Sequence, residues 1–287
     1  MLRDVRSTLT VRPSPGTRMV FAIAVAEAEG VTCDQESLRV ISPHGEISAV
    51  EVQDHHGGRL HVIDIPEDFE AAPRPPRGSE PERDTDADGF PRGSVAPGTV
   101  RVDYRSLVRG AESAPVGDEA DLIRYVRPSR YAESDKLFPT SGKLFGSLTG
   151  QELVDAVSSW VRSHISYVPG FSRGTDGAVD TFLARQGICR DFAHLVVALL
   201  RARNTPARVV AGYAPGLRPM DFHAVAEAWV DGAWQLIDAT GLAEMSSLAR
   251  IATGADASDT AFLSTVQGGI TLEHIKVDAH LLEDQQG

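Results

Sequence analysis

The sequence has little cysteine and no long apolar run. Its two cysteines, Cys33 and Cys189, are too few for a disulfide framework or a four-thiolate zinc site. A single disulfide between the two is not excluded, although a reduced, intracellular setting is the simpler interpretation. The longest apolar run, Met19 to Ala26, falls far short of the ~18 residues that span a bilayer. The sequence therefore predicts a cytoplasmic protein.

Positive charge and aromatic side chains are also scarce. The chain carries 28 Lys and Arg against 40 Asp and Glu, a net charge of −12, and only 6% aromatic residues. Such a surface repels phosphate backbones and anionic lipids and offers few platforms for base stacking. We therefore expect neither nucleic acid nor a membrane as a partner. With 287 residues and 42% hydrophobic composition, the chain can bury a core and has the length of about two domains.

The first part of the chain has the pattern of a β-sandwich. Short segments rich in Val and Ile alternate with turn residues, which is typical of antiparallel strands. These segments are Thr17–Glu27, Leu38–Ile41, Ile47–Gln53, Arg59–Ile65 and Val100–Tyr104. The proline-rich stretch 66–97 has few large apolar residues and is predicted to be a mobile loop between two strands. We assign residues 1–125 to this β-sandwich domain.

Helical periodicity begins near residue 150. Thr149 and Glu152 have the spacing of a capping box, and apolar residues follow at helical intervals. A short helix fits 179–186, and a third helix, apolar nearly all round, begins at Cys189. This last pattern predicts a buried central helix.

Strand periodicity returns after residue 206. Strands are predicted over 207–213, 223–230 and 234–238, with Asp231-Gly232 as the tight turn of a hairpin. Alternation over 272–282 predicts a final strand. Residues 126–287 are therefore assigned to a second, α+β domain with an antiparallel sheet and a C-terminal strand.

Cys189 is the most distinctive residue for chemistry. The N-terminus of a helix favours a thiolate through its free amides and its dipole, and the thiolate is the nucleophile. The amide of Cys189 itself could donate to an oxyanion. The alternative from position alone is a small buried apolar residue.

His223 and Asp238 lie at the neighbouring ends of the predicted hairpin. Counted from the turn, they fall close together on paired strands, so imidazole and carboxylate can meet. An Asp that accepts the Nδ1 proton would orient the ring and leave Nε2 facing Cys189. Taken singly, His223 could be an ordinary histidine at the end of a strand, and Asp238 could be an ordinary aspartate in a turn. Together with Cys189 they make a nucleophile, a base and an orienting residue.

Several blocks of the sequence carry a family resemblance. They are Gly187-Ile188-Cys189-Arg190-Asp191-Phe192-Ala193-His194, Pro206-Ala207-Arg208, Asp221-Phe222-His223-Ala224 and Trp234-Gln235-Leu236-Ile237-Asp238-Ala239-Thr240. Over roughly residues 120–280 the chain resembles the bacterial transglutaminase-like superfamily, which includes cysteine proteases.

The resemblance implies a fold and a reaction. The fold is a papain-like core whose central helix carries the cysteine, preceded by a β-sandwich. The reaction is acyl transfer at a carboxamide through a thioester, with Cys189, His223 and Asp238 as the triad and no cofactor. Substrates would be peptides or protein side chains, and hydrolysis by water and transfer to an amine co-substrate both stay open. Some relatives are inactive, so the alternative is a catalytically silent scaffold that binds a protein partner. The oligomeric state is left open.

Further residues are candidates for the cleft. Tyr167 or Trp160 could supply a second oxyanion donor, and His194 is expected to pack behind the site. Asp191 could cap the helix or order a loop with Arg190. The residues predicted for substrate binding or oxyanion stabilisation are Tyr167, Trp160, Asp191, Tyr213, Asp221 and Phe222.

Other kinds of site receive little support. His55, His56 and His61 lack acidic or thiol partners at metal-ligand spacing, and we interpret them as a solvated hairpin tip. No metal site is predicted. Cys33 has no nearby base and is predicted to be inert.

Overall fold

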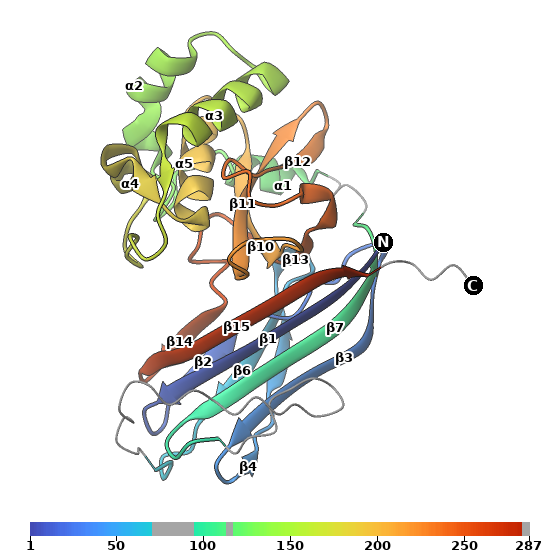
Figure 1. Cartoon of the computed structure of the whole chain (residues 1–287). Helices are drawn as coiled ribbons and strands as arrows, with labels where there is room; N and C mark the ends of the chain where they lie inside the picture. Colours follow the sequence, from blue (N-terminus) through green and yellow to red (C-terminus); the bar gives the residue numbers. More distant parts are fainter. Residues whose placement is uncertain (71–94, 113–116, 283–287) are drawn as a thin grey trace, which may run out of the picture.

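The computed structural model describes residues 1–70, 95–112 and 117–282. Most of the segment predicted as a proline-rich loop therefore lies outside the described residues. Two antiparallel sheets form one part of the molecule, and helices around a third sheet form the other (Figure 1). The α+β class is confirmed. Among the described helices, none is long and apolar enough to cross a membrane.

The two N-terminal sheets enclose one hydrophobic core. The first has the order β15-β1-β7-β3-β4 and the second β14-β2-β6-β5. In β1, every second residue is buried, and Val5, Leu9 and Val11 enter the same core as Met19 and Phe21 of β2. The bounds are β1 (Leu2–Pro13), β2 (Arg18–Phe21), β3 (Val31–Ser42), β4 (Gly45–Glu46), β5 (Val50–Gln53), β6 (Arg59–Asp64), β7 (Val100–Gly110), β14 (Leu263–Gln267) and β15 (Ile270–Leu282).

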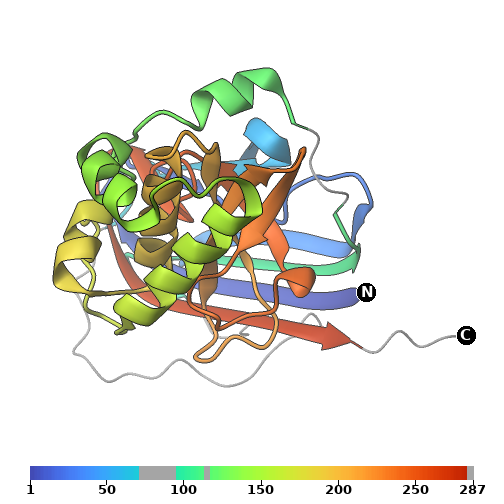
Figure 2. The ribbon, with the colours of Figure 1, turned by 90° about the horizontal axis from the view of Figure 1, so that it is seen from above.

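The domain division predicted from the sequence is wrong at its C-terminal end. The final strand exists as β15, but it pairs antiparallel with β1 along its length (Figures 1 and 2). β14 likewise joins β2 in the second sheet. Residues 263–282 thus complete the N-terminal sheets, and the helical part is inserted between β7 and β14.

The helical part is built around α5 (Cys189–Arg201), whose residues from Phe192 to Leu200 are all buried. α2 (Ser134–Phe145), α3 (Gly150–His164) and α4 (Ala178–Ala184) pack against α5. The prediction of a central buried helix at Cys189 is therefore confirmed. Two helices were not predicted, α1 (Glu119–Arg124) and α2. The helix predicted from Thr149 exists, but the Thr149 side chain makes no capping hydrogen bond.

A four-stranded antiparallel sheet, β12-β11-β10-β13, covers another side of α5. The predicted hairpin is β11 (Phe222–Val230) and β12 (Ala233–Ile237), and Asp231 and Gly232 both have positive φ, 52° and 84°. Its neighbours are β10 (Ala207–Tyr213) and β13 (Ala249–Gly254). A short parallel pair, β8 (Ser166–Tyr167) and β9 (Gln186–Gly187), leads into α5. Two 3-10 turns complete the elements, η1 (His55–Gly57) and η2 (Met245–Ser247).

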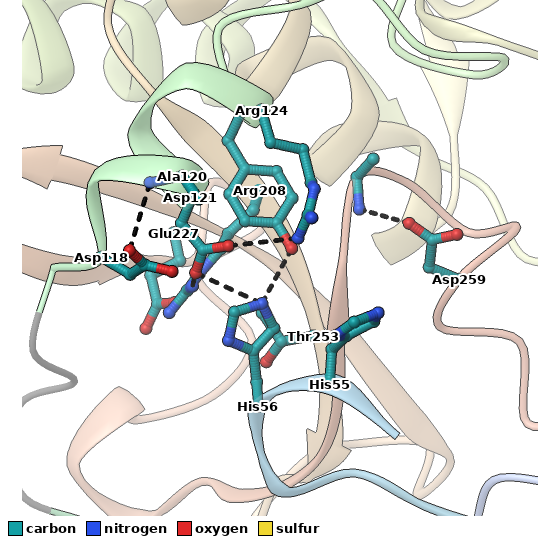
Figure 3. A network of polar contacts seen from close by, with 12 residues as sticks. His55, His56, Asp118, Ala120, Asp121, Arg124, Arg208, Glu227, Thr253 and Asp259 are labelled. Carbon is teal, nitrogen blue, oxygen red and sulfur yellow. Dashed lines mark hydrogen bonds and ion pairs between the residues drawn. The ribbon is translucent and has the colours of Figure 1, made fainter. Parts of the chain in front are cut away.

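A polar network joins the two parts of the molecule (Figure 3). His56 Nε2 lies 2.9 Å from the Tyr125 hydroxyl and 3.4 Å from Asp121 Oδ2. Arg208 donates to Asp121 Oδ2 at 3.3 Å and to Glu227 Oε2 at 2.7 Å. The hairpin tip that carries His56 is therefore docked against α1.

The prediction of a solvated tip is wrong for His56 and also for His61. His61 is buried in β6, with its Nε2 3.1 Å from Glu51. The sequence pattern could not show that the tip packs against a helix some 60 residues further along the chain.

Candidate active site

Cys189 is the first residue of α5, and its side chain is half-buried. The turn before it is fixed by Asp191, whose Oδ2 accepts a 2.9 Å hydrogen bond from the Ile188 amide. Gly187 lies directly under Asp191, and a Cβ at that position would come within 2.7 Å of the Asp191 Cβ. This tight turn places the thiol at the helix N-terminus, as the sequence predicts.

Asp191 and Arg190 are structural residues in this geometry. Arg190 donates to both the Ser172 hydroxyl (2.6 Å) and the Arg173 carbonyl (2.7 Å), and also to Asp191 Oδ1 (3.1 Å). Asp191 is 1% exposed. Its carboxylate accepts hydrogen bonds from the Ile188 amide and the Arg190 guanidinium. Asp191 therefore orders the loop at Ser172 rather than facing a substrate.

His223 and Asp238 meet as the hairpin register predicts. Ala226 pairs with Ile237, so Asp238 falls opposite Val225, on the same strand face as His223. His223 Nε2 lies 3.1 Å from Asp238 Oδ2, and both side chains are buried.

The ring is turned the other way from our expectation. Nε2 contacts Asp238, whereas Nδ1 is buried and makes no hydrogen bond of good geometry with any residue that the structure describes. Cys189 is nonetheless close enough to act on the imidazole both as a hydrogen-bond partner and through its charge. Because Nε2 is used by Asp238, Nδ1 is the nitrogen left for the thiol. The sequence fixes no χ angle, so the spacing alone could not choose between the nitrogens.

The electrostatics of the pair favour its charged form. Burial acts to lower the pKa of His223, but the hydrogen bond to Asp238 and the neighbouring Cys189 outweigh burial and raise that pKa to about 9. Burial acts to raise the pKa of Asp238, yet hydrogen bonds from His223 and Thr240 lower it to about 2. An imidazolium beside a carboxylate is therefore stable over the neutral range.

Asp238 also organises the loop that follows it. Oδ1 accepts from the Thr240 amide at 2.9 Å and from its hydroxyl at 2.6 Å. Oδ2 accepts from the amides of Leu242 and Ala243, each at 3.1 Å. Sequence reasoning missed these partners, although Asp-Ala-Thr-Gly is a typical turn sequence in which an Asp side chain caps the following amides.

Tyr167 is the candidate oxyanion donor that lies beside Cys189. Burial is the main cause that raises the pKa of Tyr167 to about 12, followed by the charges of Cys189 and Asp221, and its hydroxyl also interacts with the Cys189 backbone amide. The Tyr167 ring packs against the Phe192 ring, with the two centroids 6.0 Å apart. Tyr167 therefore stays an O–H donor over the working pH range, and its side chain is still 36% exposed.

Trp160 lies in a different environment. Its ring stacks on His164 and Phe182, with centroid distances of 4.4 and 5.6 Å, and the Arg185 guanidinium lies 4.9 Å from its centroid. These contacts place Trp160 in the packing between α3 and α4, so only Tyr167 of the two candidates is in contact with Cys189.

Tyr213 does not line a cleft, contrary to prediction. It is fully buried, and its hydroxyl contacts the Ser7 hydroxyl at 2.9 Å and donates to the Ile23 carbonyl at 2.8 Å. Phe222 is half-buried, with its ring 5.3 Å from those of Tyr213 and Phe262. Asp221 is exposed, next to His223.

His194 packs behind the site, as predicted. It is buried, its ring stacks on Tyr131 at 5.4 Å, and Nε2 accepts from the Ala257 amide at 3.0 Å. Burial lowers its pKa to about 3. Within the described ranges, no group of three or more His, Cys, Asp or Glu side chains is arranged to hold a metal ion.

Comparisons with known proteins relate the chain to one family and to a solved structure. A family model described as the transglutaminase-like superfamily matches residues 142–239, a span that contains Cys189, His223 and Asp238. A crystal structure from Cytophaga hutchinsonii, described as that of a putative cysteine protease, is similar with a TM-score of 0.80 and 30% identity. That similarity covers 97% of this chain and 90% of the other.

Two curated relatives are uncharacterized proteins of mycobacteria. One, from Mycobacterium leprae, is 26% identical over 185 residues, which are 61% of this chain and 64% of that protein. The other, from Mycobacterium tuberculosis, is 36% identical over 62 residues, 22% of this chain and 20% of that protein. The chain thus matches less than two thirds of the length of these relatives. The likeness to the Cytophaga structure extends over nearly the whole chain, and the chain belongs to the transglutaminase-like superfamily.

Proposed function

We propose that this protein is a thiol-dependent acyl-transfer enzyme that acts on peptide or side-chain amides through a thioester on Cys189. The observation that carries the proposal is the contact of one thiol, at the start of α5, with an imidazole held 3.1 Å from a buried carboxylate. A nucleophile, a base and an orienting group are the set that acyl transfer requires.

The proposed first half-reaction forms the thioester. The proton of Cys189 Sγ passes to His223 Nδ1, and the thiolate attacks the carbonyl carbon, so that a C–S bond forms and the carbonyl oxygen takes the electron pair. The Cys189 amide and the Tyr167 hydroxyl are the proposed donors to that oxygen. The tetrahedral intermediate then collapses, the C–N bond breaks, and His223 returns its proton to the leaving amine.

The second half-reaction frees the enzyme. Water or an amine attacks the thioester carbon, gives its proton to His223, and expels the Cys189 thiolate. With water the product is a carboxylic acid, and with an amine it is a new amide. Asp238 holds the Nε2–H and stabilises the imidazolium in both halves. Besides side chains and amides of this chain, the proposed steps use a peptide or protein substrate and water or an amine co-substrate.

The test of this proposal is the alkylation of Cys189 by iodoacetamide between about pH 4 and 9, followed by peptide mass spectrometry. Wild type and His223→Ala are compared, because a free thiol titrates near ~8.5. We expect rapid alkylation of wild type well below that pH and slow alkylation of the variant. Cys189→Ala should stay folded and lose all turnover on a peptide library.

Two results would contradict the proposal. One is turnover that survives in Cys189→Ala. The other is alkylation of Cys189 at the same rate with and without His223. In either case the competing hypothesis, a silent scaffold that binds a protein partner, would be preferred.

A further inference from the structure

Asp221 lies at the edge of the candidate site. It immediately precedes β11, two residues before His223. Because side chains two positions apart in an extended segment share a face, its carboxylate lies on the His223 side of the strand. Asp221 is exposed, whereas His223 is buried. Asp221 is therefore a solvent-facing neighbour of the buried imidazole.

The carboxylate of Asp221 is held by a backbone hydrogen bond, but no cationic side chain of the described residues is paired with it. Its Oδ1 accepts a 2.7 Å hydrogen bond from the Phe222 amide. Its Oδ2 makes no hydrogen bond or ion pair with any residue of the described ranges. Partial burial is the main cause that raises the pKa of Asp221, and among the residues that the structure describes His223 is the one charged side chain that acts on it. No Lys or Arg in the described ranges therefore offsets this negative charge.

Tyr167 interacts with both Asp221 and the proposed nucleophile, Cys189. Its side chain interacts electrostatically with both Cys189 and Asp221, and it is partly exposed. Arg190, the nearest arginine in the chain to Cys189, is already bound by Asp191 and Ser172. The surroundings of the thiol therefore include a carboxylate that has no ion-pair partner among the described residues.

We propose that Asp221 is a specificity-determining residue, which selects reaction partners of Cys189 that carry a cationic group, an alkylammonium or a guanidinium, close to the reacting carbonyl or amine. This inference rests on the proposed function, because it assumes that the Cys189 thiol is the nucleophile. The free oxygen, Oδ2, would accept the hydrogen bond of the cation while Oδ1 stays with the Phe222 amide.

The inference is tested without knowledge of the substrate, by charged thiol reagents. Cys189 thiolate displaces methanesulfinate from an alkyl methanethiosulfonate and forms a mixed disulfide. We compare the rate constants for the 2-aminoethyl (cationic), 2-sulfonatoethyl (anionic) and methyl (neutral) reagents, with modification of Cys189 assigned by peptide mass spectrometry. Each charged rate is divided by the neutral rate for the same variant, which removes differences in thiol reactivity.

The expected effect follows from Coulomb's law. A unit charge at ~5 Å in a water-like dielectric changes the local concentration of a monovalent ion by about fourfold, in opposite directions for the two charged reagents. Asp221→Asn should therefore lower the cation-to-anion rate ratio by about tenfold at low salt. The matched control, Asp135→Asn, removes the same charge from an exposed position at the start of α2. It should leave the ratio close to that of wild type, which separates a local effect from the net charge of −12.

The outcomes distinguish the two proposals. Rapid reaction with the neutral reagent and an unchanged ratio in Asp221→Asn would overturn the inference and leave the proposed function standing. No reaction of wild-type Cys189 with the neutral reagent would overturn both.

The source of the cationic group is tested separately. Peptides with Lys, norleucine or Glu beside the amide are compared in hydrolysis, and 1,5-diaminopentane is compared with pentylamine as acceptor. A preference for Lys that disappears in Asp221→Asn would assign the cation to the acyl donor, and a preference for the diamine would assign it to the acceptor. Equal rates within both sets would overturn the inference.

Discussion

Replacement of Asp238 by asparagine separates the charge of this residue from its role as a hydrogen-bond acceptor. The carboxylate accepts bonds from His223 and from the amides of Leu242 and Ala243 at Oδ2, and from the Thr240 amide and hydroxyl at Oδ1. An asparagine keeps one acceptor oxygen. If this oxygen takes the Oδ2 position, it accepts from His223, Leu242 and Ala243. The NH₂ group of the asparagine then points at Thr240. The ring of His223 then keeps its Nε2–H tautomer but loses the negative charge beside it.

The magnitude follows from the exchange of a charged acceptor for a neutral one. Hydrogen bonds to charged groups contribute about 1.5–3 kcal/mol against about 1 kcal/mol for neutral ones. A loss of about 2 kcal/mol in stabilisation of the imidazolium corresponds to about 30-fold in rate. Since one pKa unit is about 1.4 kcal/mol, the pKa of His223 should fall by more than one unit from its value of about 9. Asp238→Ala is unsuitable, because it leaves the loop amides unpaired.

The assay is an NMR titration of the His223 imidazole, with turnover measured alongside. Asp256→Asn is the matched control, because Asp256 is a buried carboxylate that accepts from the amides of Tyr131 and Ser258 in another loop. It should reduce stability to a similar extent and leave the titration of His223 unchanged. An Asp238→Asn protein in which His223 still titrates near pH 9 would refute the electrostatic reasoning.

The same pair sets a pH window for stability. The folded pKa of Asp238 is about 2, below its unfolded value of ~3.9, so its contribution is present above about pH 4 and is lost as the pH falls toward 2. The folded pKa of His223 is about 9, above its unfolded value of ~6.5, so its contribution is complete below about pH 6.5 and is lost as the pH rises through 9. The two shifts describe one interaction, of about 2–3 kcal/mol. Urea unfolding at pH 2.5, 5 and 9.5 should show this plateau in wild type and a flatter profile in Asp238→Asn.

Three further predictions concern other residues. Tyr167→Phe should lower kcat by about 100-fold or more, the loss expected for one oxyanion donor. The iodoacetamide reactivity of Cys189 at neutral pH should stay within about twofold of wild type. Glu227→Gln should destabilise the protein by about 3–5 kcal/mol in urea unfolding, because Glu227 is buried between Arg208 and Arg250. A fragment of residues 126–287 should fail to give a cooperative unfolding transition by circular dichroism, because β14 and β15 lose their partner strands; a cooperative transition would restore the domain division predicted from the sequence.

The elements that the sequence predicted well are those with strong local periodicity. α5 is apolar on nearly all sides, and the hairpin of β11 and β12 has an unmistakable turn at Asp231-Gly232. The register of that hairpin brings His223 to Asp238. Local patterns were sufficient here because each signal depends on residues within one helix or one hairpin.

The elements that were missed depend on partners far away in the chain. β1 buries Arg3 and Ser7 along with its apolar residues, so its alternation is hidden. The two terminal nitrogens of Arg3 donate to the carbonyls of Leu248 and Gly110, and the Ser7 hydroxyl is hydrogen-bonded to Tyr213. No local pattern could show that these polar side chains face a core, because their partners lie more than 100 residues away.

The β-sheet part of the molecule also supports the strand that carries His223. β10 pairs with β11 in a register that sets Gly212 opposite His223 and Tyr213 opposite Phe222. Tyr213 leaves the helical part and inserts into the core of the N-terminal sheets, where Ser7 and Ile23 bind its hydroxyl. A slip of β10 by one residue would withdraw this buried hydroxyl from both partners and invert the face on which its side chains lie. The N-terminal sheets therefore fix the register of β10, and through it the position of β11 and of the imidazole that faces Cys189.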